Sequence, residues 1–331
     1  MPAPSLREPD DAPPEDGPGS RRRLLRAVLF ALLLAALAVP LLGQPYYTKL
    51  VARMAIFAIA ALSLDLLVGY GGLVSFGHAA FFGIGVYTAG LLPMLGIRQA
   101  VVIVPAAALA GALVGCVTGA VSLRASGLYF IFITLAFAEM IFYIAQGLRM
   151  FGGDDGFRLP AATLLGGELS LGHPVVLAYT MIGLLLVFIY AGRRIAASRF
   201  GQVVVAARDD EGKLRAIGLS PFPGRLLLYT IASAMCAVAG VGFANLVEYV
   251  SPASMSWIQS GEFLFMVILG SAATLVGPVL GAAAYVGLEQ VLSSWTEHWM
   301  FWLGVILVLR VLLLRQGLYG LITGRRGAGG A

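Results

Sequence analysis

Long apolar runs, separated by short polar or glycine-rich stretches, constrain the fold of this 331-residue chain more than any other feature. A helix needs about 20 apolar residues to cross the hydrocarbon core of a bilayer. Hydrophobic residues make up 59% of the chain and charged residues only 12%, whereas soluble domains are typically about 25% charged. A membrane β-barrel would instead show short segments of alternating hydrophobicity. We therefore expect an all-α polytopic membrane protein with about ten transmembrane segments. The expected segments are 24–42, 48–69, 78–97, 100–122, 127–147, 174–192, 226–248, 261–275, 279–293 and 299–315.

Basic residues fall where they would orient these segments. Positively charged loops stay on the cytoplasmic side of a membrane, and the connection 193–225 carries seven basic and three acidic residues. Four arginines between residues 21 and 26 precede the first segment, so we place its start inside. The fourth segment then ends inside at Arg124, the sixth at 193–225 and the tenth near Arg315, Arg325 and Arg326. Orientation thus explains the net charge of +5 better than nucleic-acid binding does, and both termini are expected to be cytoplasmic.

Two regions stand apart from the apolar segments. Residues 1–20 are rich in Pro, Asp, Glu and Gly and almost lack apolar side chains, so we expect a disordered tail. Residues 21–331 then form one transmembrane domain. Within it, residues 149–172 are the longest connection on the external side. This connection could be a docking surface or a plain solvated link.

The basic connection 193–225 contains signals for a short helix at 209–217. Asp209 or Asp210 can cap its start, and Glu211 lies in its first turn. Gly218 is a plausible C-terminal stop, and Pro221 prevents continuation. The alternative interpretation is a solvated basic loop that only sets the topology.

Two glycine-rich stretches interrupt the apolar pattern. Segments 261–275 and 279–293 are short for a spanning helix, and Thr274–Pro278 lies between them. Residues 69–78 form a similar interruption before the third segment. Irregular backbone at membrane depth is tolerated only inside protein or along a water-filled cavity, so we expect both to be packed within the bundle. The residues expected to break the backbone are Gly69, Gly71, Gly72, Gly77, Gly277 and Pro278.

A few polar side chains fall inside apolar segments, where ionisable groups are costly. Asp65 and Glu139 are the deepest, and each could orient a polar pathway or simply be neutralised by hydrogen bonds. His78 follows the first break, and capping that break is its simplest role. The candidate residues of a translocation pathway are Asp65, Ser75, His78, Thr134, Glu139 and Asn245. No clustered His, Cys or carboxylate motif suggests a metal site or a membrane-embedded enzyme.

Five blocks, occurring in order, resemble the LivM-type permeases, which are membrane subunits of ATP-binding-cassette (ABC) importers for branched-chain amino acids. The first is LSLDLLVGYGGLVSFGHAAFFGIGVY at 62–87, and the resemblance extends from about residue 50 to 315. Two positions depart from the family pattern: Phe151 stands where threonine is usual, and Gly212 where an apolar helix former is frequent. The other blocks are 127–140, 152–156, 201–218 and 261–282.

The resemblance implies a machine of several subunits in the bacterial inner membrane. Its expected partners are two ABC ATPase subunits, a second homologous permease subunit and a periplasmic or lipid-anchored substrate-binding protein. The phosphate-loop motif GxxxxGK[ST] is absent from the chain. We therefore expect no enzyme activity and no cofactor in this chain, with ATP and Mg²⁺ bound by the ATPase subunits. Residues 149–172 would be periplasmic.

The resemblance also suggests which residues act. The connection 193–225 would contact the ATPase, and its short helix would pass ATPase closure to the bundle. A close alternative is the same kind of importer for urea, short amides or another small solute, and a more distant one is a self-sufficient channel or secondary transporter. The expected ATPase-coupling residues are Arg208, Asp209, Asp210, Glu211, Arg215, Ala216 and Gly218.

Overall fold

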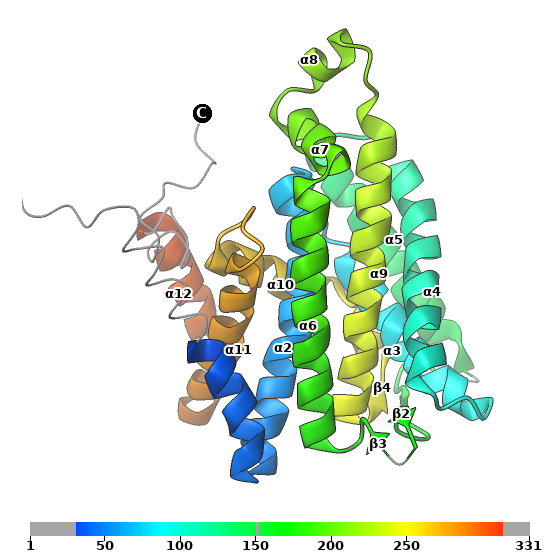
Figure 1. Cartoon of the computed structure of the whole chain (residues 1–331), viewed down its shortest axis with the longest axis vertical. Coiled ribbons are helices and arrows are strands. Elements are labelled where there is room, and N and C mark those ends of the chain that lie inside the picture. The colour runs from blue at the N-terminus through cyan, green and yellow to red at the C-terminus, as the bar shows by residue number, and fades with distance from the viewer. Residues whose placement is uncertain (1–30, 150–151, 168, 314–331) are drawn as a thin grey trace, which may run out of the picture.

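The computed structural model describes residues 31–149, 152–167 and 169–313, which fold into a bundle of helices (Figure 1). The expected disordered tail 1–20, the arginines at 21–26 and the C-terminal arginines at 315, 325 and 326 lie outside the described residues. The helices are Ala31–Leu41, α2 (Pro45–Asp65), α3 (His78–Met94), α4 (Ala100–Ser122), α5 (Leu128–Gly147), α6 (Pro174–Ala197), α7 (Arg199–Asp209), α8 (Glu211–Ala216), α9 (Pro221–Val247), α10 (Trp257–Gly270), α11 (Gly277–Trp295) and α12 (Trp299–Leu313). Shorter helical turns are η1 (Val39–Leu42), the π-helix η2 (Leu66–Tyr70) and η4 (Pro252–Met255).

The helices confirm a polytopic membrane architecture. Each expected segment coincides with a helix among the described residues. Five helices are long and apolar enough to cross a membrane: Pro45–Tyr70, which joins α2 to η2, and α4, α5, α6 and α9. Within the described part of the chain, four strands of two or three residues accompany the helices. Short antiparallel pairs join β1 (Phe157–Arg158) to β4 (Tyr249–Val250) and β2 (Leu164–Gly166) to β3 (Leu169–Ser170), and they satisfy backbone groups at one end of the bundle.

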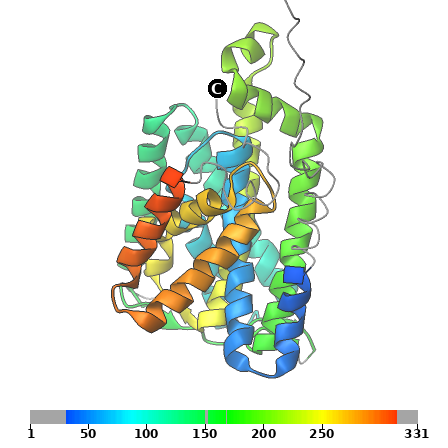
Figure 2. The ribbon, with the colours of Figure 1, turned by 90° about the vertical axis from the view of Figure 1, so that its left-hand side faces the viewer.

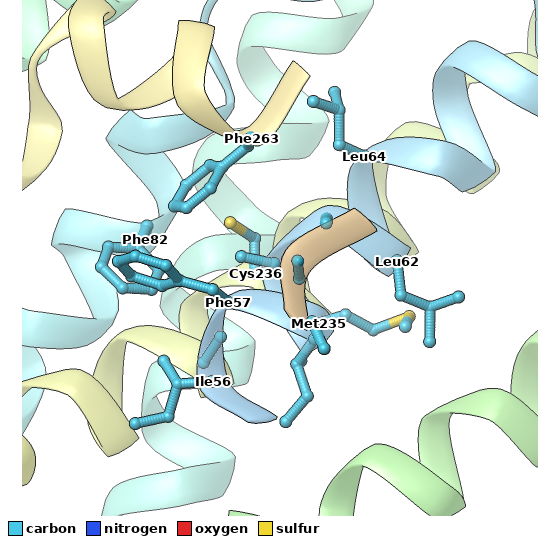
Figure 3. Close-up of a cluster of buried hydrophobic side chains, with 14 of the residues drawn as sticks. Ile56, Phe57, Leu62, Leu64, Phe82, Met235, Cys236 and Phe263 are labelled. Carbon is cyan, nitrogen blue, oxygen red and sulfur yellow. The ribbon is translucent and has the colours of Figure 1, made fainter. Parts of the chain in front are cut away.

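Helices α2 and α9 form the interior. In their most apolar stretches 78% and 67% of residues are buried, against 22% in α4 and α5, which therefore present most of their surface outward. Aromatic rings of α2, α3 and α10 pack together at the centre (Figure 3). The ring centroid of Phe263 lies 5.8 Å from that of Phe57 and 5.2 Å from that of Phe82. Side chains of α9, including Met235 and Cys236, belong to the same buried cluster.

Glycines bring α3 and α9 into backbone contact. A methyl group added at Gly85 would overlap the carbonyl oxygen of Ala237, and one added at Gly240 would overlap that of Phe82. Small residues at helix contacts allow this approach in membrane proteins, where packing rather than water exclusion drives association. The small-residue pattern of the sequence thus marks real helix contacts.

The two long connections lie at opposite ends of the bundle (Figure 1). At one end, part of the connection 149–172 pairs with β4, and the amide of Leu159 donates to the carbonyl of Glu248 over 3.0 Å. At the other end α7 and α8 project beyond α6 and α9. Arg124 lines a groove together with residues of α8, so it shares the end with 193–225. The predicted grouping of these two basic markers, opposite 149–172, is therefore confirmed.

Both backbone breaks differ from their expected limits. The second break covers 271–276 rather than Thr274–Pro278, because Gly277 and Pro278 are the first two residues of α11. Proline is tolerated in a first helical turn, where its missing N–H needs no partner. In the first break, Gly69 lies inside η2, whereas Gly71, Gly72 and Gly77 belong to the non-helical stretch before α3. Gly72 has φ +67°, a conformation that favours glycine.

We expect Gly240→Ala to lower the stability of the protein by about 1–3 kcal/mol, because the added methyl group forces α9 away from the backbone of α3. The measurement is the thermal unfolding midpoint of the purified protein in detergent. Gly183→Ala in α6 is the matched control, since a Cβ there would meet nothing within 4 Å. Equal midpoints for the two variants would contradict the close α3–α9 contact.

Candidate functional site

The segment between α6 and α9 is more helical than expected. The predicted helix at 209–217 is present as α8, and a second helix, α7, which was not predicted, precedes it. The hydroxyl of Ser198 caps α7 by accepting from the amide of Gly201 over 3.1 Å. Helix α8 then runs from Glu211 to Ala216. Helix α6 extends to Ala197 and α9 begins at Pro221, so little of the connection is irregular.

The caps of α8 are those that its sequence indicates. The carboxylate of Asp210 accepts from the amide of Lys213 over 2.9 Å. At the other end Gly218 has φ +81°, and the amides of Gly218 and Leu219 bond back to the carbonyls of Arg215 and Leu214. This pair of bonds is a Schellman cap. Asp210 as the start and Gly218 as the stop are therefore confirmed.

Glu211 joins α8 to the start of α9. Its carboxylate accepts from Arg215 over 2.5 Å and from Arg225 over 2.8 Å, and Arg225 also donates to the carbonyl of Ala207 over 2.9 Å. Partial burial alone would raise the pKa of Glu211, but the hydrogen bonds and charges of Arg225 and Arg215 outweigh it and hold the pKa below its ordinary value. The Asp210 pKa is also lowered, chiefly by the hydrogen bond from the Lys213 amide.

A groove of about 610 Å³ opens beside α8, between it, the turn after α4 and the start of α9. Arg124, Arg215 and Arg225 line it with Glu211, so the groove is basic overall. Apolar side chains continue its rim, including Leu219 and Phe222, and Ala216 and Gly218 are exposed at the end of α8. This surface combines positive charge with exposed apolar groups, as protein-docking surfaces commonly do.

Arg208 connects α7 to the first break. Its Nη1 donates to the carbonyl of Gly69 over 2.5 Å, and its Nε and Nη2 both donate to Asp209. Gly72 leaves room for this side chain, because a Cβ at that position would overlap the Arg208 methylene groups. Arg208 therefore attaches a helix outside the bundle to the backbone inside it.

Asp65 connects the first break to the second. It is fully buried, and its Oδ1 accepts from the amide of Ala273 over 2.8 Å. Among the described residues its Oδ2 has no hydrogen-bond partner. Gly69 packs on the same residue, since a Cβ there would overlap the Ala273 nitrogen. Ala273 has φ +61° and Ser271 has φ +102°, so this carboxylate supports a strained stretch of backbone.

His78 does not cap the break, contrary to expectation. It is the first residue of α3, and its Nε2 lies 2.8 Å from the hydroxyl of Ser63 in α2. The Ser63 hydroxyl donates its own proton to the carbonyl of Ala60. The Nε2 atom of His78 therefore carries a proton and donates it to the Ser63 oxygen. The start of α3 is satisfied by Ser260 of α10, which accepts from the amide of Ala79 over 2.9 Å.

Two of the predicted pathway groups meet at the first break. The hydroxyl of Ser75 accepts from the amide of Gly77 over 3.2 Å. Thr134 of α5 accepts from the amide of Phe76 over 3.3 Å, and Gly77 lies against the Thr134 carbonyl. The break is thus held against α5 by its own backbone.

The other two predicted pathway groups lie elsewhere. Glu139 is half-buried on α5. Asn245 lies near the end of α9, where its amide group bonds both the backbone and the hydroxyl of Thr163. Sequence reasoning missed Ser63, Ser260 and Ala273, because their partners are distant in the chain and nothing local marks them. Among the described residues, no group of three His, Cys, Asp or Glu side chains could hold a metal ion.

Protonation of Glu211 should loosen α8. Since its pKa is lowered in the folded protein, the stabilisation is present above the ordinary value of 4.5 and is lost as pH falls below that value. We expect Glu211→Gln to lower the protection factors of amide hydrogen exchange in residues 207–217 at pH 7. The unmodified chain should show the same loss of protection, relative to the intrinsic exchange rate at each pH, as the pH falls below 4.5. Glu297→Gln, at an exposed position, is the control. Unchanged exchange in Glu211→Gln would mean that its ion pairs do not hold α8.

Comparisons with known proteins agree with this architecture. A family described as branched-chain amino acid transport system / permease component matches residues 46–314. The LivM high-affinity branched-chain amino acid transport system permease proteins of Salmonella typhimurium and Escherichia coli are each 29% identical over 92% of this chain and 77% of their own length. A probable branched-chain amino acid transport permease protein LivM of Methanocaldococcus jannaschii is 24% identical over 76% of this chain and 82% of its own.

No solved structure matches the chain. The family match nevertheless covers far more than half of the sequence and includes α2 to α12, both breaks and the α7–α8 segment. The chain is a multi-pass membrane protein of transport type, and it belongs to the family of permease components of branched-chain amino acid transport systems.

Proposed function

We propose that this chain is the membrane-spanning permease subunit of an ABC importer that carries leucine, isoleucine and valine across the bacterial inner membrane. Membership of the permease family supports the transport role, and the two LivM relatives support the substrate class. The proposed partners are two ABC ATPase subunits, a second homologous permease subunit and a periplasmic or lipid-anchored substrate-binding protein. ATP and Mg²⁺ bind to the ATPase subunits, so this chain needs no cofactor of its own.

The ATPase docks on α7, α8 and the basic groove. This surface lies outside the apolar part of the bundle, at the end away from residues 149–172 (Figure 1). Cytoplasmic orientation follows from its net positive charge. The docking and coupling residues are Arg208, Asp209, Asp210, Glu211, Arg215, Ala216 and Gly218.

The single observation that carries the coupling proposal is the hydrogen bond from Arg208 to the Gly69 carbonyl. A displacement of α7 pulls on η2, and η2 is tied to the second break through Asp65 and Ala273. Both breaks are non-regular backbone inside the bundle, and ATPase closure would act by changing their conformation, as a switching element requires. ATPase closure thus reaches the centre of the membrane through one continuous set of bonded residues.

Substrate passes alongside the first break. Hydrogen-bonding groups around residues 75–78 come from Ser75, His78 and Thr134. A carboxylate comes from Asp65, the residue directly before η2. Asn245 steadies the outer end of α9, and Glu139 supplies an acidic group on α5. The apolar side chains that surround these groups suit a substrate with an aliphatic side chain.

The direct test of the function is reconstitution. The chain is purified with its neighbouring gene products and placed in proteoliposomes, and uptake of radiolabelled leucine is measured with and without ATP. We expect ATPase subunits to co-purify and uptake to require both ATP and the binding protein. Uptake without ATP would instead identify a channel or secondary transporter. ATP-driven uptake of urea or a short amide, but not of leucine, would show that the substrate assignment is wrong.

Replacing Arg208 tests the coupling route. Arg208→Lys keeps the positive charge but loses the forked geometry that reaches Gly69 and Asp209 together. We expect ATP-driven uptake to fall about tenfold, equivalent to about 1.4 kcal/mol, while ATPase activity and complex yield persist. Arg98→Lys, exposed beside β2 at the opposite end of the bundle, is the matched control. Full uptake by Arg208→Lys would exclude this bond from the coupling route.

A further inference from the structure

A mixed cluster of charged side chains lies on the face formed by α2, α10 and α11, away from the breaks and from the α7–α8 surface. Arg53 of α2 donates to Glu289 of α11 over 2.8 Å. Glu262 of α10 faces both of them, accepts from Gln259 over 2.7 Å and lies beside Tyr285. Neither the pathway nor the coupling route described above uses these groups.

The cluster lies well inside the apolar part of the bundle. Arg53 is eight residues from the start of α2, and Glu289 is six from the end of α11. At 1.5 Å per residue these positions are about 12 Å and about 9 Å from the helix ends. Figure 2 shows α11 running down towards the end of the bundle at which α2 begins. Arg53 and Glu289 therefore lie at similar distances from the same end of the bundle.

The cluster is partly open rather than sealed. The Arg53 side chain is 33% exposed and Glu262 is half-buried, although neighbouring exposed side chains such as Ile258 and Val291 are apolar. Charged groups at this depth are unfavourable against lipid and face protein or a water-filled space. A partly open charged face of this kind can line a water-filled space shared with the second permease subunit of the proposed importer.

The chemistry of the cluster matches both ends of a free amino acid. Two carboxylates outnumber one guanidinium, so the cluster favours an added cation, and Glu289 Oε2 has no partner among the described residues. Arg53 uses Nη2 for Glu289, while a guanidinium has five N–H donors in all. The carboxylates of Glu262 and Glu289 can accept hydrogen bonds from an ammonium group, and the remaining donors of Arg53 can bind a carboxylate. The ring of Phe57, which is buried in the core, lies 5.2 Å from the Arg53 guanidinium and packs against it.

We propose that Arg53, Glu262 and Glu289 form a transient binding site for the zwitterionic head of an α-amino acid on the translocation pathway. The proposal rests on the proposed function and adds to it a specific place where the main-chain groups of the substrate bind. The aliphatic side chain is left to apolar surroundings, which accounts for one site serving leucine, isoleucine and valine.

The test uses the complete reconstituted complex. Glu262→Gln and Glu289→Gln remove one carboxylate charge each, and Glu297→Gln, at the exposed α11–α12 turn, is the matched control. We expect leucine uptake per ATP hydrolysed to fall about tenfold in the first two variants, the scale of one lost charge-assisted bond, and to be unchanged in the control. Unchanged uptake per ATP in both variants, or an equal fall in the control, would overturn the proposal.

A second measurement separates binding from assembly. The purified complex without binding protein is titrated with radiolabelled leucine. Two competitors are then added: leucinamide, which lacks the carboxylate, and 4-methylpentanoate, which lacks the ammonium group. We expect both to compete at least about tenfold more weakly than leucine, and competition equal to that of leucine would overturn the proposal. If the single variants do not assemble, Arg53→Glu combined with Glu289→Arg preserves the ion pair, and full uptake by that variant would also overturn it.

Failure of this inference and failure of the proposed function give different results. If the chain is not part of an importer, the native complex shows no ATP-driven leucine uptake at all. If only the zwitterion site is wrong, native uptake is normal and the Glu262 and Glu289 variants match it.

Discussion

The hydrogen bond between Asp65 and the amide of Ala273 is the contact on which the centre of this protein depends. Two helices are interrupted inside the bundle, and interrupted helices leave backbone groups that lipid cannot satisfy. The Asp65 carboxylate accepts from a backbone amide of the second break, and Asp65 itself is the last residue of α2, directly before the first break. Because it is a single side chain joining two irregular segments, neither segment can change its conformation without affecting the other.

The contacts around this bond extend outward in two directions. Towards the α7–α8 end, Arg208 donates to the carbonyl of Gly69. A helix outside the apolar bundle is thus hydrogen-bonded directly to backbone inside it. Towards the bundle centre, Ser260 of α10 caps α3, and aromatic rings of α2, α3 and α10 pack together. The interrupted segments are therefore surrounded by rigid packing, which confines any rearrangement to the breaks themselves.

Local signals in the sequence predicted local structure well. The apolar runs predicted every helix of the bundle, and Asp210 and Gly218 predicted the ends of α8 because capping involves residues only three or four positions away. Helix α7 was missed because its uninterrupted apolar run, residues 203–207, is only five residues long and is bounded by charged and polar residues. The contacts of Asp65 and Arg208 could not be predicted either, since their partners lie 208 and 139 positions away and depend on how the helices pack. The same holds for the Arg53–Glu289 pair, which joins residues 236 positions apart.

The double capping of α8 has a consequence for how a partner would bind to it. Six residues rarely hold a helix in water by themselves, and Gly212 weakens this one further. Here the Asp210 side chain caps one end and the Gly218 turn caps the other, while Arg225 of α9 bonds to Glu211 in the first turn. The helix is therefore preorganised, and little conformational entropy remains to be lost on association. Its docking surface keeps its shape between encounters, so a partner that releases it can bind it again in the same geometry.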